Sequence, residues 1–274
     1  MNPRKTARPI LLVGAGRMGG ALLKGWVAKG FAPLIVVESQ PSPELQSLAR
    51  SRTLRLYSCA EDVTERVRAC VIALKPQVLK TEAHHYAAIA QSGALMMSIA
   101  AGTTTRALFG AWGRTARIIR GMPNTPGRIG HGISALFATK TATVGDRKLA
   151  ETLLGALGET VWVKREALID SVTAVSGSGP AYVFLLVEAL AAAAQAEGLA
   201  RNAAEKLARA TVSGAGALLD ADRRPVHELR RDVTSPGGTT EAALMVLMAG
   251  DGLQSIMARA VSAARQRAEE LGSG

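Results

Sequence analysis

A glycine-rich loop near the start of the chain has the residue types and spacing that bind phosphate groups. Gly14-Ala-Gly-Arg-Met-Gly19 follows the apolar run 10–13 and opens a helix-like run. Gly14 permits a tight turn, Gly16 lets a pyrophosphate approach the backbone, and Gly19 allows close packing of helix on strand. Strand, loop and helix thus come in the order that dinucleotide binding requires, with phosphates at the helix N-terminus. The predicted cofactor loop comprises Gly14, Ala15, Gly16, Arg17, Met18 and Gly19.

A second stretch, Asp232-Val-Thr-Ser-Pro-Gly-Gly-Thr-Thr240, is rich in hydroxyls and small residues and precedes an apolar, helix-like run. It contains no nucleophile–base pair and no cluster of metal ligands. Its N–H and hydroxyl groups suit either an ordinary helix cap or a cradle for an anion. Both interpretations stay open from these residues alone.

Glu38 bears on the choice of cofactor, because it ends the second apolar run, about 20 residues after the glycine loop. A carboxylate there accepts hydrogen bonds from the ribose hydroxyls and disfavours the 2′-phosphate of NADP. The adjacent Ser39 has a hydroxyl that can still bind a phosphate. The pattern therefore favours NADH and leaves NADPH possible, whereas a plain surface acid is the alternative for Glu38.

The first half of the chain alternates short apolar runs with helix-like stretches, the rhythm of a parallel sheet covered by helices on both faces. The expected strands are 10–13, 34–37, 70–74, 94–100, 117–120, 133–138 and 160–163. Ligands of such sheets bind at the carboxyl ends of the strands. Two further loops at such ends are expected to border the cofactor, and they contain Ala73, Leu74, Lys75 and Pro76, and Ala100, Ala101 and Gly102.

From about residue 166 the strand-like runs give way to long Ala/Leu-rich segments, at 180–197, 201–219, 239–249 and 252–271. We therefore expect a Rossmann-type NAD(P)-binding domain over residues 1–165 and an all-α domain over 166–274. The first two helices are apolar almost all round and must be buried. An ordinary bundle within one chain is possible, but a second chain supplying part of the burial is favoured.

Charge and composition exclude several classes of protein. The net charge is +11 and the sequence pI is near 10.3, but the basic residues are scattered and are not interleaved with stacking aromatics. We expect no nucleic acid partner. The longest apolar stretch, within 181–195, is interrupted by Glu188, so no membrane span is expected. Two cysteines without metal spacing suit a reducing cytoplasm.

Hydrolase and metal chemistry are also hard to assemble from this chain. None of the four histidines lies in a metal motif, so no metal site is expected. Ser176-Gly-Ser178-Gly lacks the preceding strand and the base of a nucleophile elbow. A nicotinamide enzyme needs neither, because the cofactor carries the hydride.

The motifs of the chain, in register and order, resemble those of the pyrroline-5-carboxylate reductase family from residue 9 to about 271. The motifs that carry the resemblance are Gly14–Gly19, Ala73–Pro76, Ala100–Gly102, Arg120–Pro126, Val175–Tyr182 and Asp232–Thr240. The resemblance implies a Rossmann domain followed by a helical dimerisation domain. It also implies NADPH- or NADH-dependent reduction of 1-pyrroline-5-carboxylate to L-proline, the final step of proline synthesis, by a homo-oligomer that is a dimer or a ring of dimers built through the C-terminal helices.

The resemblance further implies roles for single residues. The substrate carboxylate would be held by hydroxyl and N–H groups of Ser235, Gly237, Gly238 and Thr239. Thr240 would place its hydroxyl by the ring nitrogen and is the expected catalytic residue, and Glu166 would line the substrate pocket. Lys75 and Pro76 would border the nicotinamide, near Ala100–Gly102.

Two residues depart from the family pattern. Asp232 stands where some relatives have Asn, and Glu38 stands where many have a small hydroxyl residue, which again favours NADH.

Two other functions remain as alternatives. One is a related imine reductase or β-hydroxyacid dehydrogenase, although the latter's usual Lys is absent from 177–186. The other is a basic NAD-sensing or nucleic-acid-binding protein without turnover.

Overall fold

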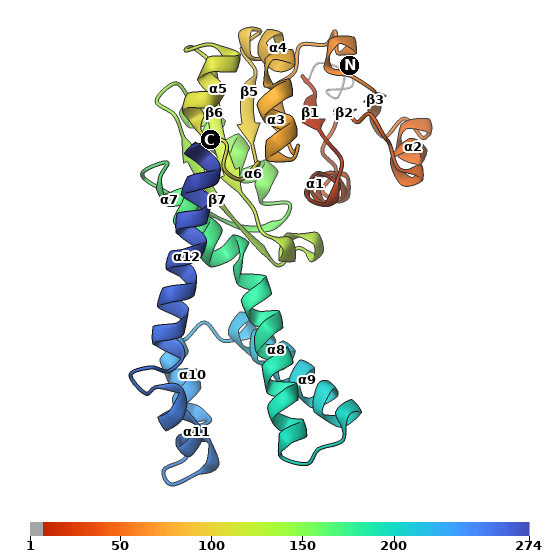
Figure 1. Cartoon of the computed structure of the whole chain (residues 1–274). Helices are drawn as coiled ribbons and strands as arrows, with labels where there is room; N and C mark the ends of the chain where they lie inside the picture. The colour runs from red at the N-terminus through yellow and green to blue at the C-terminus, as the bar shows by residue number, and fades with distance from the viewer. Residues whose placement is uncertain (1–7, 274) are drawn as a thin grey trace. The chain divides into compact units, whose positions relative to one another are not determined.

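A computed structural model of the chain describes residues 8–273 (Figure 1). Most of the basic N-terminal segment, residues 1–7, lies outside this range. The chain forms two compact units. One holds the residues up to Gly177 together with those from Ala264 onward, and the other is Ser178–Ala263. Residues 166–177 thus pack with the N-terminal unit, beyond the expected boundary at 165.

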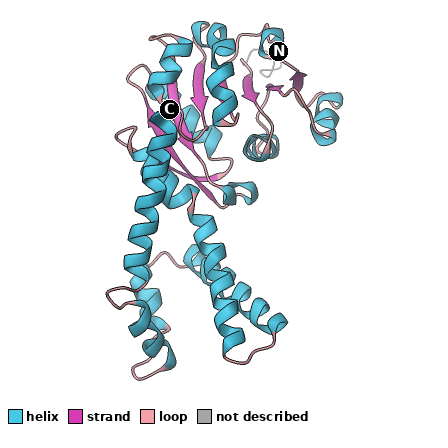
Figure 2. Ribbon diagram, viewed as in Figure 1, coloured by secondary structure: helices cyan, strands magenta, loops and turns pink. Residues whose placement is uncertain are grey.

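The first unit contains an eight-stranded sheet in the order β3-β2-β1-β4-β5-β6-β7-β8. Its strands are drawn in magenta in Figure 2. Its first six strands follow the order of a dinucleotide-binding fold, with the chain reversing direction across the sheet between β1 and β4. The strands are β1 Ile10–Val13, β2 Leu34–Val37, β3 Arg55–Tyr57, β4 Ala69–Ile72, β5 Leu95–Ser98, β6 Arg117–Met122, β7 Gly132–Ala138 and β8 Gly158–Trp162.

One strand pair departs from the expected parallel sheet. β7 runs antiparallel to β6, while all other neighbouring pairs are parallel. The connection from β6 to β7 is residues 123–131, which includes the short 3-10 helix η4, Thr125–Ile129. A parallel crossover needs about a dozen residues or more, so this connection returns the chain in the opposite direction.

Helices cover both faces of the sheet, because alternate strand residues point to opposite sides. Leu12 packs in one hydrophobic cluster and Leu11 in the other. The first cluster is completed by α1 (Arg17–Ala28), α2 (Pro43–Arg50) and α6 (Val144–Leu154). The second is completed by α3 (Pro76–Glu82), η3 (Ala83–Tyr86), α4 (Ala87–Gln91) and α5 (Thr105–Trp112). Each face also buries one tryptophan whose indole N–H donates to a backbone carbonyl: Trp26 to Leu153 and Trp112 to Ala83, both at 2.8 Å.

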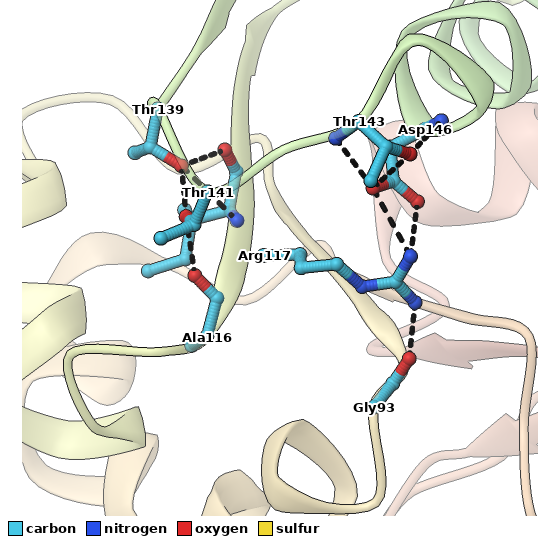
Figure 3. A network of polar contacts seen from close by, with 8 residues as sticks. Gly93, Ala116, Arg117, Thr139, Thr141, Thr143 and Asp146 are labelled. Atoms are coloured by element: carbon cyan, nitrogen blue, oxygen red, sulfur yellow. Dashed lines mark hydrogen bonds and ion pairs between the residues drawn. The ribbon is translucent and has the colours of Figure 1, made fainter.

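A polar network fixes α6 against the start of β6 (Figure 3). The Arg117 guanidinium donates to both carboxylate oxygens of Asp146, at 2.9 and 3.1 Å, and to the carbonyl of Gly93. Asp146 also accepts from the N–H and hydroxyl of Thr143, whose oxygen accepts in turn from the Asp146 N–H at 3.1 Å. This reciprocal capping box starts α6 at a fixed place on the sheet. Arg117 is the first residue of β6, so this network lies at the amino end of that strand. Ligands of such sheets bind at the opposite, carboxyl ends of the parallel strands.

The second unit is helical, and the short helix α7 (Leu168–Val172) with a π turn (Thr173–Gly177) leads into it. Its helices are α8 Gly179–Ala196, α9 Arg201–Ala221, α10 Val226–Asp232, α11 Thr239–Leu247 and the first half of α12 Leu253–Ser273. The expected long helices are present, and α10 is an addition to them. Among the α8 residues Ala191 alone is buried, so the single chain does not itself supply the burial expected for the helix around 180–197.

Candidate active site

Three loops meet at one edge of the sheet in the first unit. The glycine loop follows β1, Ala73–Pro76 follows β4, and Ala100–Gly102 begins just after β5. These three strands are adjacent in the order β1-β4-β5. The structure therefore brings the cofactor residues expected from the sequence to neighbouring strand ends, where ligands of doubly wound sheets bind.

The glycine loop has the shape that a pyrophosphate requires. Gly14 has φ +83°, and a Cβ on Gly19 would lie 2.0 Å from the Gly14 carbonyl oxygen, so both positions demand glycine. A Cβ on Gly16 would meet no atom within 4 Å. Gly16 is also the N-cap of α1, which has no side-chain cap and no acidic residue in its first turn. The first N–H groups of α1 thus have no side-chain cap, and the space at Gly16 leaves room for an anion to bind there.

Glu38 is tied to this loop by its own carboxylate. One oxygen accepts from the N–H of Ala15 at 2.8 Å, and the other accepts from the N–H of Gln40 at 3.1 Å. The first bond joins the end of β2 to the glycine loop after β1. Glu38 is therefore fixed at the edge of the predicted adenosine site.

The remaining loops are fixed by short backbone contacts. The Ala73 N–H donates to the Val13 carbonyl at 2.8 Å, and Lys75 is the exposed N-cap residue of α3. Gly102 has φ +67°, and a Cβ there would lie 3.3 Å from the backbone of Leu271 in α12. The C-terminal end of α12, which belongs to the first unit, thus packs against the loop expected beside the nicotinamide.

Glu166 forms a cluster that the sequence did not predict. Its carboxylate accepts from the Arg120 guanidinium at 2.7 Å, from the Thr105 N–H at 2.6 Å and from the Thr105 hydroxyl. Arg120 lies in β6 with its side chain 4% exposed, and Thr105 begins α5. Both Glu166 oxygens are thus engaged within the protein. The predicted role of Glu166 in lining a substrate pocket stays a prediction.

Asp170 lies near this cluster, one turn further along the chain in α7. Burial raises the pKa of its carboxyl, although the positive charge of Arg120 acts in the opposite direction. The carboxylates of Glu269 and Glu166 raise the pKa further.

Within residues 8–273 no group of His, Cys, Asp and Glu side chains is placed to hold a metal ion.

The hydroxyl-rich stretch lies in the second unit, between α10 and α11. Gly238 is the N-cap of α11, and Thr239 and Thr240 are its first two residues, as the sequence predicts. Gly237 has φ +70°. Its N–H donates to the Glu241 carboxylate at 2.7 Å, and the Gly238 N–H donates to the Ser235 carbonyl at 3.0 Å.

These contacts refine which groups of the stretch can receive a ligand. The N–H groups of Gly237 and Gly238, expected to bind a carboxylate, are engaged in the loop's own hydrogen bonds. The first-turn N–H groups of α11 have no intrahelical partner, because every α-helix leaves them free. Ser235 and Thr239 are exposed and Thr240 is half-buried. The stretch is thus both a helix start and a set of donors, and it has no acidic or basic catalytic pair.

Comparison with known proteins gives these features a family. The family model for pyrroline-5-carboxylate reductase dimerisation matches residues 166–271, and that for NADP oxidoreductase coenzyme F420-dependent matches residues 9–102. The pyrroline-5-carboxylate reductase of Pseudomonas aeruginosa is 36% identical, over 96% of each chain.

Solved structures agree with the sequence matches. A pyrroline-5-carboxylate reductase from Coxiella burnetii has a TM-score of 0.89 and 34% identity, over 97% of this chain and 99% of that one. The Plasmodium falciparum pyrroline carboxylate reductase, solved with NADP bound, has a TM-score of 0.79 and 26% identity, over 97% and 98%. With a relative 36% identical over 96% of the chain and the dimerisation model matched over residues 166–271, the chain belongs to the pyrroline-5-carboxylate reductase family.

Proposed function

We infer that this protein catalyses the NAD(P)H-dependent reduction of 1-pyrroline-5-carboxylate to L-proline, the final step of proline biosynthesis. The observation that carries this conclusion is the match to relatives of this one activity along 96% of the chain. It is supported by the open cradle above Gly16 and the donor-rich start of α11. The protein is thus an oxidoreductase acting on a CH–NH bond.

The first unit supplies the residues that fit the cofactor. The pyrophosphate would lie on the glycine loop, where Gly16 leaves room and α1 presents free N–H groups. The nicotinamide would lie near Lys75, Pro76 and Ala100–Gly102. When bound, the reduced nicotinamide supplies the hydride. The residues of this chain contribute position, because hydride transfer depends mainly on orientation.

The start of α11 is proposed to hold the substrate. The substrate carboxylate would be bound at Ser235, Gly237, Gly238 and Thr239, through the hydroxyl groups and the first-turn N–H groups of α11, since the Gly237 and Gly238 N–H groups are engaged within the loop. The hydroxyl of Thr240 would lie by the ring nitrogen, where it can accept from an iminium or donate to the product amine. A protonated imine carbon is already electrophilic, so no strong acid is needed. Glu166 is proposed to line the substrate pocket, as the family resemblance implies.

The protein is expected to work as an assembly of chains. The dimerisation family model covers 166–271, and large apolar side chains are exposed on the second unit, including Phe184 at 64% and Met245 at 74%. We propose a dimer, or a ring of dimers, built through the C-terminal helices. The helical domain is proposed to begin near 166, where that family model begins. We also propose that the protein acts in the cytoplasm, on small molecules and without a nucleic acid or membrane partner.

The direct test mixes the purified protein with 1-pyrroline-5-carboxylate and either NADH or NADPH. The loss of reduced nicotinamide absorbance and the appearance of L-proline are then measured. A Gly16→Leu variant fills the cradle without a clash in the folded chain, so it should keep its fold and lose cofactor binding. Gly110→Leu, at another glycine with open space around its Cβ, is the matched control.

Two results would contradict this function. Failure of both cofactors to be oxidised with this substrate would leave the alternative of a binding protein without turnover. Oxidation with other cyclic or open-chain imines but not with 1-pyrroline-5-carboxylate would favour a general imine reductase. The β-hydroxyacid dehydrogenase alternative is disfavoured because α8 contains no lysine.

A further inference from the structure

A cavity of ≈ 310 Å³ lies in the first unit beside the glycine loop, where an adenosine group would be bound. Gly14 and Glu38 line it at the carboxyl ends of β1 and β2, and Leu74 lines it just after β4. In this fold the adenosine ribose lies against the residue that ends β2. The other residues that line the cavity and bear on its charge are Ser39, Glu61, Glu82 and His85.

This cavity is lined by three carboxylates from three separate elements. Glu38 follows β2, Glu61 lies in the 3-10 helix η2 (Ala60–Asp62), and Glu82 is the last residue of α3. No Lys or Arg is among the described residues that line it. Its histidine, His85, is paired with Glu61. The cavity therefore presents negative charge and hydroxyl groups to a ligand.

The cations near the glycine loop line a different cavity, of ≈ 270 Å³. Arg17, Lys24 and Arg128 belong to that one, on the side of α1 and α2. Lys24 is there paired with Glu44, its Nζ lying 3.1 Å from the carboxylate. A 2′-phosphate directed into the carboxylate-lined cavity would thus meet no described Lys or Arg on its walls.

Glu38 is held ready to accept the ribose hydroxyls. Its two oxygens are fixed by the N–H groups of Ala15 and Gln40, and a carboxylate oxygen can accept more than one hydrogen bond. A hydroxyl can donate to it, whereas a phosphate at the same place offers only acceptor oxygens and negative charge. Glu61 and Glu82 are exposed, so their repulsion of a phosphate is weaker and depends on salt.

We propose that Glu38, Glu61 and Glu82 together make this enzyme select NADH over NADPH, with Glu38 the main determinant and the other two adding to it. The proposal rests on the proposed function only in that the bound ligand is a nicotinamide dinucleotide. Part of the discrimination between NADH and NADPH thus comes from Glu61 on η2 and Glu82 on α3, and not from Glu38 alone.

The test measures equilibrium binding of NADH and NADPH, separately from turnover. Nicotinamide fluorescence gives one readout. Protection of Cys59 from a thiol reagent gives another, because this exposed thiol lines the same cavity. We expect the wild type to bind NADH on the order of 100-fold more tightly than NADPH at low salt, with each tenfold equivalent to about 1.4 kcal/mol. The ratio of the NADPH dissociation constant to the NADH dissociation constant should fall as salt is added.

The variants separate the three carboxylates. Glu38→Ser should reduce the ratio about tenfold, and Glu61→Gln and Glu82→Gln should each reduce it about two- to threefold by tightening NADPH binding. Glu44→Gln, an exposed acid on the neighbouring cavity, should leave the ratio unchanged. Because Glu82 is exposed, its variant keeps the proposal testable if Glu38→Ser fails to fold.

Two results would overturn the proposal. The first is that NADPH binds as tightly as NADH, or more tightly, and that Arg17→Gln weakens this NADPH binding. That result would place the 2′-phosphate on the α1 side. The second is unchanged ratios in Glu61→Gln and Glu82→Gln, which would reduce the selectivity to Glu38. Absence of turnover with both cofactors, while NADH still binds, would instead contradict the proposed function and leave this inference standing.

Discussion

The Glu166 carboxylate should be a major contributor to the stability of the first unit, and Glu166→Gln tests this. The carboxylate joins the segment before α7 to two elements, because it accepts from Arg120 in β6 and from the N–H and hydroxyl of Thr105 at the start of α5. The side chain of Arg120 is 4% exposed and that of Glu166 is 26% exposed. Glutamine keeps the shape and one acceptor oxygen, but it removes the carboxylate with which the buried guanidinium forms its ion pair.

The expected loss follows from these contacts. Hydrogen bonds to a charged group contribute about 1.5–3 kcal/mol each. Removing one partner of a buried ion pair costs about 3–5 kcal/mol. Since Glu166 is one-quarter exposed and glutamine retains part of the bonding, we expect the free energy of unfolding to fall by about 2–4 kcal/mol.

The assay is urea unfolding at a fixed protomer concentration, because assembly makes apparent stability depend on concentration. Glu44→Gln is the matched control. It removes the same charge from an exposed pair, whose side chains are 65% and 63% exposed, so it should cost less than about 1 kcal/mol. Equal stability of the two variants would refute the argument. A separate rise in KM for the substrate would support the proposed contact of Glu166 with the pocket.

Three further predictions follow from the structure. Thr240→Val should lower kcat/KM about a hundredfold and Thr240→Ser should restore most of it, as steady-state kinetics would show; full activity in the valine variant would exclude a role for the hydroxyl. Burial raises the pKa of the Cys70 thiol, so alkylation and mass spectrometry should find Cys59 modified and Cys70 unmodified until urea unfolds the protein. Burial raises the pKa of Asp170 against the opposing charge of Arg120, so the folded state binds this proton more tightly and the ionised form costs stability at neutral pH. Asp170→Asn should therefore raise the free energy of unfolding at pH 7, and the gain should shrink as pH falls toward the unfolded carboxyl pKa of about 3.9; a gain that does not change with pH would contradict this cause.

The central strands were predictable because burial on both faces produces continuous apolar runs. The predicted runs 10–13 and 34–37 coincide with β1 and β2, in which all residues are buried. The edge strand β3 was missed because it is three residues long and none of them is buried. The helix α10 was missed for the same reason, since it buries no residue and so has no apolar face to detect.

The candidate site was predictable only as far as it depends on local sequence. The glycine loop and the start of α11 are contiguous stretches, so their turns and free N–H groups can be recognised from residue types. The Glu166 cluster joins residues 46 and 61 positions apart, and no local pattern specifies such a pairing. One signal was present: Arg120 lies within an apolar strand, and a buried guanidinium needs a carboxylate partner.

The exposed apolar helix α8 has to be explained by a partner, and the chain itself favours a second copy over a lipid bilayer. The helical stretch Leu168–Ala196 is long and apolar enough to cross a membrane by length and composition. Glu188, however, lies within it, near the middle of α8, and a charge at the centre of a membrane helix costs about 2.5–3.5 kcal/mol. The helix that packs on it, α9, carries Arg201, Glu205 and Lys206 on exposed positions and needs water. We therefore expect the apolar surface of α8 to be covered by another chain. Dilution of the protein should then lower its thermal midpoint, whereas the thermal midpoint of a monomer would not change on dilution.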